Sequence, residues 1–286
     1  MESQGAGVNR PIEAVVFDMD GVLVDSEPLW REVEQEVFGG LGILVTDEDL
    51  ERTMGVRINE VVALWRSLHP WEEPPPEEVE RRIVDGVARA IRERGVVNDG
   101  AGEAIAYFRG LGMRLALASS SPFRLIDTVL AVSGLGGQFE VVHSAEEEVL
   151  GKPDPAVYLT TARKLGVPPE RCLAIEDSPS GVRSARAAGM RCVAVPERPA
   201  PDGEFHGADL VLESLAAAGD WMWQALGVRP SQTSRDRTTV PTEEEAMGTK
   251  DKGGGKASKK VAQKSLKEKR QAKKSKDTKP GQISAR

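Results

Sequence analysis

The sequence is poor in cysteine, histidine and aromatic residues, and it has no long apolar run. It contains 2 Cys and 3 His among 286 residues, and aromatic side chains make up 5%. Two cysteines cannot build a disulfide framework, and with the histidines they show no zinc-ligand spacing. No apolar run approaches the ~20 residues that a bilayer span needs. We therefore expect a protein without a disulfide framework, structural zinc or membrane spans.

The first residues, MESQGAGVNRP, contain no apolar segment and include an acidic residue, Glu2. This pattern argues against a secretion signal and against a transit peptide, so we expect a cytoplasmic protein. Hydrophobic residues make up 40% and charged residues 29% of the chain, which is ordinary for a globular enzyme. The length suffices for one large domain or two small ones.

Positive charge is concentrated in one segment. Lys250 to Arg286 contains 12 Lys and 2 Arg against 3 acidic residues, a net charge of +11. Subtracting this from the total of −7 leaves −18 for residues 1–249. The basic segment contains few large apolar side chains, so we expect it to be disordered, with the disorder starting near Pro230. Such a tail would bind nucleic acid or another acidic surface or direct the chain to the nucleus; a solubilising extension without a partner is the alternative.

Short apolar runs alternate with amphipathic helical patterns in the acidic part. Strand–helix alternation predicts an α/β protein with a doubly wound parallel sheet, helices on both faces and right-handed crossovers. The site of such a fold lies beyond the carboxyl ends of its strands. The clearest strands are predicted at residues 14–17, 115–118, 173–175 and 192–195, with weaker candidates at 140–142 and 210–212.

One stretch lacks strand patterns. Between about Leu29 and Arg94, apolar residues recur at helical spacing, once from Ile58 to Leu68 and once from Val79 to Ile91. We interpret this stretch as a small helical cap domain inserted after the first strand, over the strand ends. The predicted organisation is a disordered N-terminus at 1–10, an α/β core at 11–28 and 95–227, a helical cap at 29–94, and a disordered tail at 228–286, Lys-rich from 250.

The first strand ends in an acidic pair. Asp18 and Asp20 are two residues apart, and Gly21 permits a sharp turn directly after them. Two carboxylates at the end of an apolar strand are costly unless a cation neutralises them, and Mg²⁺ prefers such oxygen ligands. A pair of solvated loop aspartates is the alternative interpretation.

Polar residues also follow the other predicted strands. Ser119 and Ser120 precede a helix start, where hydroxyl and N–H groups can hold a phosphate. Lys152 lies between Gly and Pro before another helix, and Glu176 with Asp177 forms a second acidic pair. Each has an ordinary alternative, such as a helix cap or a solvated lysine. Four such sites at four strand ends nevertheless indicate one common site for a phosphorylated ligand and a metal ion.

Four segments resemble motifs of the haloacid dehalogenase-like phosphohydrolase superfamily in their order and spacing: VVFDMDGVLVDSEPLW, ALASSSP, GKPDPAVYL and AIEDSPSGVRSARAAGM. The resemblance covers about residues 11–217 and includes the helical cap. Within the superfamily, SEPLW, GVRINEVVALW, HPW and KPDPAVYL are similar to 2-deoxyglucose-6-phosphate (hexitol) phosphatases, a group close to the β-phosphoglucomutases.

The resemblance implies a role for each motif residue. Asp18 would be the nucleophile that forms an aspartyl phosphate, and Asp20 the general acid and then base. Asp18, the carbonyl of Asp20 and Asp177 would hold Mg²⁺, with Glu176 bound directly or through water. Lys152 would neutralise Asp18 and the phosphate together. The transferred phosphoryl group would be held by Ser119 and by the N–H of Ser120.

The cap residues that the resemblance places at the sugar end of the substrate are Glu27, Trp30, Arg57 and Asn59. The implied function is a Mg²⁺-dependent phosphatase of a small phosphorylated metabolite, a hexose or hexitol phosphate, with a monomeric core. A β-phosphoglucomutase-like mutase and a phosphatase of nucleotide-like substrates such as FMN stay open. In the related mutases the Trp30 position resembles a histidine that supports phosphoryl return; tryptophan cannot exchange that proton, so hydrolysis is favoured.

Overall fold

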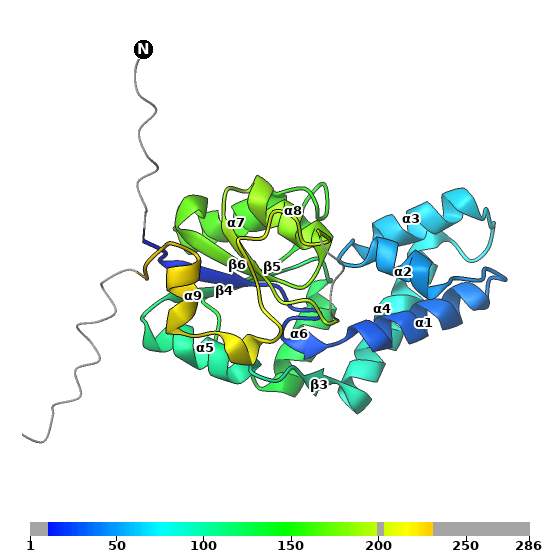
Figure 1. Cartoon of the computed structure of the whole chain (residues 1–286). Helices are drawn as coiled ribbons and strands as arrows, with labels where there is room; N and C mark the ends of the chain where they lie inside the picture. Colours follow the sequence, from blue (N-terminus) through cyan, green and yellow to red (C-terminus); the bar gives the residue numbers. More distant parts are fainter. Residues whose placement is uncertain (1–10, 199–202, 231–286) are drawn as a thin grey trace, which may run out of the picture. The chain divides into compact units, whose positions relative to one another are not determined.

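The computed structural model describes residues 11–198 and 203–230. Six parallel strands form one sheet in the order β5–β4–β1–β6–β7–β8 (Figure 1). This confirms the doubly wound α/β fold, and all six predicted strands are present. The strands are β1 (Ala14–Phe17), β4 (Arg114–Ser119), β5 (Val141–Ser144), β6 (Cys172–Glu176), β7 (Arg191–Ala194) and β8 (Leu210–Val211).

The two faces of the sheet bury side chains of different size. On β1, Val15 and Phe17 belong to one apolar cluster, and Ala14 and Val16 to another. The first cluster packs against α5 (Ala101–Gly110), α6 (Phe123–Ser133) and α9 (Asp220–Ala225). The second, rich in alanine, packs against α7 (Ala156–Leu165) and α8 (Pro179–Ala187) on the opposite face (Figure 1). Burial on both faces explains why the strands lack polar alternation.

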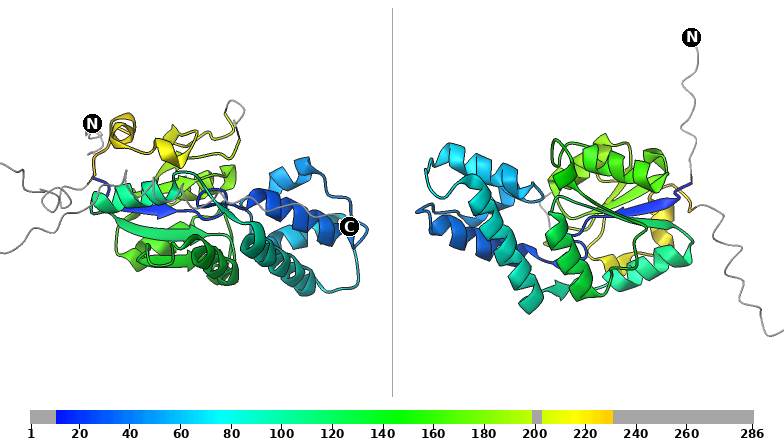
Figure 2. Two further views of the ribbon diagram at one scale, coloured as in Figure 1. Left: turned by 90° about the horizontal axis from the view of Figure 1, so that it is seen from below. Right: turned by 180° about the vertical axis from the view of Figure 1, so that it is seen from behind.

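Four helices come between β1 and α5 in the chain. They are α1 (Glu27–Gly39), α2 (Asp47–Thr53), α3 (Ile58–Leu68) and α4 (Pro76–Arg94). Figure 2 shows them together beyond the end of the sheet to which the β1 arrow points. The segments that enter and leave this helical insertion pair as two short antiparallel strands, β2 (Val24–Asp25) and β3 (Val96–Val97). The sequence did not predict this pair, because two-residue strands carry no periodicity.

The C-terminal boundary predicted from the sequence needs a correction. Residues 228–230, which we assigned to the tail, lie against the start of β1. Val228 is buried, the backbone N–H of Ile12 donates to the carbonyl of Arg229 at 2.9 Å, and Ile12 forms a bridge with Pro230. The remaining tail and residues 1–10 lie outside the described residues. In the part of the chain that is described, no helix is both long and apolar enough to cross a membrane, and Cys172 and Cys192 are free and buried.

Candidate active site

The carboxyl ends of the central strands lie level with one another. Phe17 on β1 pairs with Leu117 on β4 and with Ile175 on β6. The next residues on the first and last of these strands, Asp18 and Glu176, are therefore at the same height. The chain runs from β1 toward β4 and from β6 toward β7, so the crossovers diverge between β1 and β6. This divergence is where doubly wound sheets bind their ligands.

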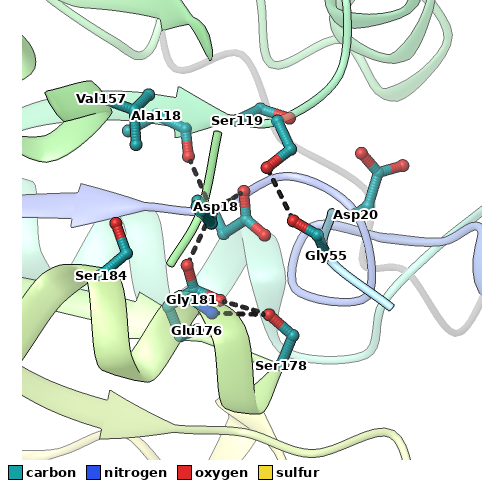
Figure 3. A network of polar contacts seen from close by, with 12 residues as sticks. Asp18, Asp20, Gly55, Ala118, Ser119, Val157, Glu176, Ser178, Gly181 and Ser184 are labelled. Atoms are coloured by element: carbon teal, nitrogen blue, oxygen red, sulfur yellow. Dashed lines mark hydrogen bonds and ion pairs between the residues drawn. The ribbon is translucent and has the colours of Figure 1, made fainter. Parts of the chain in front are cut away.

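One ammonium group ties these strand ends together. Lys152 Nζ lies 2.9 Å from Asp18 Oδ1 and 2.7 Å from Glu176 Oε1, and it donates to the Ala118 carbonyl at 3.4 Å. Figure 3 shows Asp18, Ala118 and Glu176 converging at this point. The Tyr158 hydroxyl donates to the same Glu176 oxygen at 2.5 Å. Burial alone would lower the pKa of Lys152, but Asp18 and Glu176 raise it above its ordinary value, so the group stays charged.

Three buried carboxyl groups meet beside this lysine. Asp18, Glu176 and Asp177 each place one oxygen within 4.8 Å of the others. Burial raises the pKa of Asp18 to about 7, with Lys152 opposing the rise and Glu176 and Asp20 adding to it. Burial also raises the pKa of Asp177 well above its ordinary value, and repulsion from Asp18 and Glu176 adds to the rise. One ammonium cannot neutralise three carboxylates, so the cluster fits a divalent cation with hard oxygen ligands.

The three carboxyl groups are not equally available to a metal. Glu176 accepts from Lys152 and Tyr158 at one oxygen and from Ser178 at the other, the last at 3.3 Å. Asp18 and Asp177 both line the pocket described below, whereas Glu176 does not. Glu176 therefore binds Lys152, whereas Asp18 and Asp177 face the pocket.

Glycine at position 21 allows this close approach. Gly21 has a φ of 67°, in the left-handed region, and a Cβ there would lie 2.0 Å from Asp177 Oδ2. Any side chain would push the Asp177 carboxyl out of place, because real Cβ atoms do not approach other heavy atoms so closely. The glycine after the first acidic pair thus lets the second acidic pair reach it.

Asp20 is held by three donors. The Ser26 hydroxyl donates to Oδ1 at 2.7 Å, the Trp30 indole N–H donates to Oδ1 at 3.1 Å, and the Ser121 hydroxyl donates to Oδ2 at 2.7 Å. Figure 3 shows the Asp20 side chain to one side of the Asp18 carboxyl. Ser26 and Trp30 lie at the start of α1, and Ser121 follows β4, so the insertion and the sheet jointly orient this carboxyl group.

A pocket lies between the strand ends and the helical insertion. The sheet contributes Asp18, Asp20 and Asp177, with Ser120, Ser121 and Pro122 after β4. The facing wall comes from α1 to α3 and mixes apolar with ionisable side chains. That wall consists of Glu27, Trp30, Arg31, Glu34, Leu50, Thr53, Met54, Gly55, Val56, Ile58 and Val61.

The turn before α3 is fastened to the sheet by backbone contacts. The Ser120 hydroxyl donates to the carbonyl of Gly55 at 2.8 Å, and the Ser180 hydroxyl donates to that of Met54 at 3.1 Å. Gly55 has a φ of 75°, and a Cβ there would lie 2.5 Å from Ser178 Oγ. Two strand-end loops thus contact the insertion at one turn.

Arg57 joins the helical insertion to the loop that follows β5 through several hydrogen bonds. Its guanidinium donates to the carbonyls of Ala145, Glu148 and Val149 at 3.0, 2.8 and 3.0 Å, and to Glu60 through two nitrogens. The same oxygen of Glu60 accepts from the backbone N–H of Gly151 at 3.0 Å. Arg57 and Glu60 therefore hold the loop that leads into Lys152.

Comparison with known proteins agrees with this site. Residues 12–189 match the family model of haloacid dehalogenase-like hydrolases. This chain belongs to that family. It is 40% identical over 208 residues to hexitol phosphatase B of Escherichia coli strain K12, covering 72% of this chain and 94% of the relative.

Solved structures give the same result. CbbY from Rhodobacter sphaeroides, crystallised with phosphate, is 30% identical to this chain, with a TM-score of 0.67. The match covers 73% of this chain and 96% of the CbbY chain. The β-phosphoglucomutase of Clostridium difficile has a TM-score of 0.68 at 21% identity over 76% of this chain and 97% of its own, which shows a shared fold.

The structure of this haloacid dehalogenase-like protein brings most of the predicted site residues together. Asp18, Asp20, Asp177 and Ser120 line the pocket. So do two of the predicted cap residues, Glu27 and Trp30. The four strand ends thus contribute to one site, as expected from a parallel sheet.

Two predicted residues lie behind the pocket. The Lys152 side chain is fully buried between Asp18 and Glu176, so its charge acts on the carboxyl groups from inside the protein. Ser119 is 1% exposed, and its hydroxyl accepts from the backbone N–H of Ser121 at 3.0 Å. Neither lines the pocket.

Arg57 and Asn59 differ from the prediction, because neither lines the pocket. The resemblance placed Arg57 at the sugar end of the substrate, but Arg57 is buried and its donors are taken by backbone carbonyls and Glu60. Asn59 is exposed on the first turn of α3. The sequence placed both residues near the substrate through neighbouring motifs, and the turn geometry directs them elsewhere.

Several functional side chains were missed. Tyr158 and Ser121 orient Glu176 and Asp20, and both lie inside motif segments that carried the resemblance. Ser26 is the residue before α1, where a hydroxyl is expected to cap the helix, yet it donates to Asp20 instead. Glu34 lines the pocket, although the sequence predicts an ordinary solvated charge on an amphipathic helix. Only its position three residues after Arg31 and seven after Glu27 indicated a shared face.

Proposed function

We propose that this chain is a Mg²⁺-dependent phosphatase that hydrolyses a small phosphorylated sugar or polyol, a hexose or hexitol phosphate, through an aspartyl phosphate. The observation that carries the proposal is the pairing of Asp18 with buried Lys152 at the floor of a pocket that Asp20 and Asp177 also line. This arrangement supplies a nucleophile, a proton donor and concentrated positive charge for phosphoryl transfer.

In the first step, an oxygen of Asp18 attacks phosphorus, and the bond from phosphorus to the substrate oxygen breaks. Asp20 gives its proton to the departing alkoxide, so the alcohol leaves neutral. In the second step, water attacks the aspartyl phosphate, Asp20 takes a proton from that water, and Asp18 is released with inorganic phosphate. Lys152 keeps Asp18 ionised for attack, against the burial that favours its protonated form.

The metal would be held by Asp18, the backbone carbonyl of Asp20 and Asp177, with Glu176 behind them. The fit rests on the excess of three carboxyl groups over one ammonium at this point. Bound Mg²⁺ would neutralise charge on the transferring phosphoryl group. Ser120 would hold that group through its backbone N–H, and Ser119 stays a proposed ligand through its hydroxyl.

The substrate class is supported by the relatives. Besides the hexitol phosphatase, a "phosphorylated carbohydrates phosphatase" of Thermotoga maritima is 35% identical over 179 residues, covering 63% of this chain and 82% of its own. A wall containing Glu27 and Trp30 gives a hydrogen-bonding group and an apolar surface for a carbohydrate.

A sugar-phosphate mutase is the second candidate, since structures named β-phosphoglucomutase share the fold. Trp30 argues for hydrolysis, because its indole N–H donates to Asp20 and indole cannot act as a general acid or base near neutral pH. Incubation with a hexose 1-phosphate separates the two: the mutase yields the 6-phosphate, and the phosphatase yields free hexose. An FMN phosphatase stays a prediction that the same phosphate-release assay tests.

The proposal is tested by phosphate release from a panel of sugar and polyol phosphates, with and without Mg²⁺. We expect release to require the metal, and Asp18→Asn to lower kcat by about 10⁴-fold or more. Asp127→Asn, an exposed change on α6, is the control and should leave the rate unchanged. A normal rate in Asp18→Asn would contradict the proposal.

The remaining predictions concern parts of the chain that the structure does not describe, or its surroundings. Polyanion binding by the Lys-rich tail, a monomeric core, the other predicted domain boundaries and the cytoplasmic location all stay predictions. Deleting residues 231–286 separates the tail from catalysis: phosphate release should persist, and salt-sensitive binding to nucleic acid should disappear.

A further inference from the structure

The wall of the pocket on α1 carries three ionisable side chains on one helical face. Glu27, Arg31 and Glu34 are spaced four and three residues apart, and all three line the pocket. They belong to the helical insertion, whereas Asp18, Asp20 and Asp177, which line the same pocket, follow strands of the sheet. Whatever part of a substrate extends from its phosphate toward the insertion must therefore contact this face.

Glu34 is the unusual member of this group. Its side chain is nine-tenths buried, since the residue is 8% exposed. Its Oε2 atom is buried without a hydrogen-bond partner, and within residues 11–198 and 203–230 the carboxyl group forms no ion pair. Leaving a buried polar group unpaired costs about 1–3 kcal/mol, and more when it is charged. The described protein does not compensate this cost.

Three other carboxyl groups of the site are compensated within the protein, and a fourth, Asp177, belongs to the cluster that fits a metal ion. Asp20 accepts from three donors, Glu176 from Lys152, Tyr158 and Ser178, and Asp18 pairs with Lys152. Glu34 does not belong to that cluster, so a metal ion held there would not compensate its carboxyl group. A ligand that brings hydrogen-bond donors to Glu34 would compensate it.

We propose that Glu34, together with Glu27, forms a hydroxyl-binding subsite for the uncharged end of a polyhydroxy monophosphate. This inference rests on the proposed function and narrows its substrate class. A carboxyl group accepts hydrogen bonds from hydroxyls, and neighbouring hydroxyls of a polyol can reach both of its oxygens. Where both carboxyl groups are ionised, a second phosphate at this end would face two negative charges against one guanidinium, so the subsite then selects against bisphosphates.

Arg31 provides the competing interpretation. Its guanidinium lines the same pocket and also a neighbouring one with Glu197 and Arg198, and among the described residues it forms no ion pair. Were Arg31 the dominant group, the distal end of the substrate would be anionic. Comparing kcat/KM for a hexitol 6-phosphate and a hexitol 1,6-bisphosphate therefore shows whether the two carboxyl groups or the guanidinium contact the distal end of the substrate.

The test compares two substrates in wild type, Glu34→Gln and Glu34→Leu. One substrate is a hexitol 6-phosphate, and the other is 4-nitrophenyl phosphate, which has no hydroxyls to bind. We expect both variants to lower the preference for the hexitol phosphate, expressed as the ratio of the two kcat/KM values, by about 10- to 100-fold and mainly through KM. Glu36→Gln, on the exposed side of the same helix, is the matched control and should leave the ratio unchanged.

A second measurement does not depend on turnover. Calorimetric binding of the hexitol 6-phosphate to Asp18→Asn, with and without Glu34→Gln, reads the subsite directly, and the double variant should bind about tenfold more weakly or worse. Loss of phosphate release in wild type with this binding difference intact would reject the proposed function and keep the subsite.

Three results would overturn the inference. Equal losses with both substrates would show that Glu34 acts on the fold. An unchanged ratio together with unchanged binding would show that it does not contact the substrate. A wild type that prefers the hexitol bisphosphate to the monophosphate would assign the subsite to Arg31.

Discussion

Buried carboxyl groups at the strand ends of the sheet have partners within the protein or at the candidate metal site, whereas a buried carboxyl group on the α1 wall of the pocket has none among the described residues. At the strand ends, Asp18, Asp20 and Glu176 are each paired within the protein, and Asp177 belongs to the cluster that fits a metal ion. On α1, Glu34 is nearly as buried and has no partner in the described part of the chain. Every phosphate ester presents the same phosphoryl group, so the residues that handle it can be fixed in advance. The residues that select the rest of the substrate obtain their hydrogen-bond partners only when the substrate binds.

Removing the counter-charge of the strand-end carboxyl groups should have the largest effect on stability and activity. Lys152→Met leaves Asp18 and Glu176 buried without their counter-charge, which typically costs about 3–5 kcal/mol of stability. We expect kcat to fall by about 10³-fold or more, since Asp18 then favours its protonated form. Chemical unfolding and phosphate release measure the two effects.

Two variants frame this experiment. Lys164→Met removes a lysine that is 41% exposed and should change neither quantity appreciably. Adding Glu176→Gln to Lys152→Met removes the surplus charge and should recover stability without activity. Recovery of activity in the double variant would refute the role of Lys152 in keeping Asp18 ionised.

An intermediate effect is expected where the two regions meet. Arg57→Gln removes the hydrogen bonds to the carbonyls of Ala145, Glu148 and Val149. We expect about 2 kcal/mol less stability, about a tenfold lower kcat/KM, and faster amide exchange in residues 145–151, because this loop positions Lys152. Arg52→Gln, 69% exposed on α2, is the control. Unaltered exchange in that loop would show that Arg57 does not hold it.

The smallest effect concerns the unpaired side and depends on pH. Burial raises the pKa of Glu34 to about 8 from 4.5. Between these values the folded protein keeps a proton that the unfolded chain releases, so the stability of the wild type falls as pH rises. Relative to wild type, Glu34→Gln should gain at least about 1 kcal/mol between about pH 5 and about pH 8.

The check on this prediction is urea unfolding of both proteins at the two pH values. Glu36→Gln, which removes an exposed carboxyl from the same helix, should show no such gain. A difference between wild type and Glu34→Gln that does not vary with pH would mean that Glu34 is not desolvated in solution.

Much of the sheet side was predictable from the sequence. Apolar runs bounded by helical patterns predicted the six strands, and a parallel sheet brings residues that follow its strands to one edge. Asp18, Ser120 and Asp177 therefore reach one pocket although 159 positions separate the first from the last. The prediction worked because strand ends are defined by local sequence.

The helical side was less predictable. Arg57 binds the carbonyl of Ala145, 88 residues away, and no local pattern indicates such a partner. Glu34 has the sequence context of an ordinary solvated helix charge, and its burial depends on how α1 to α3 fold over the strand ends. Predictions on this side came from neighbouring motifs, which locate a segment but do not orient its side chains.

The central claim is that Asp18 attacks phosphorus. Rapid acid quenching of the Asp20→Asn variant during turnover of 4-nitrophenyl phosphate, followed by peptide mass spectrometry, tests it directly. The 4-nitrophenolate leaving group needs no proton from residue 20, so the first step proceeds, but Asn cannot accept the proton of the attacking water in the second. We therefore predict that one phosphoryl group accumulates on the peptide that contains Asp18 and disappears with hydroxylamine. Phosphate release by the wild type with no phosphorylated peptide in the variant, or with the phosphoryl group on another residue, would contradict the account.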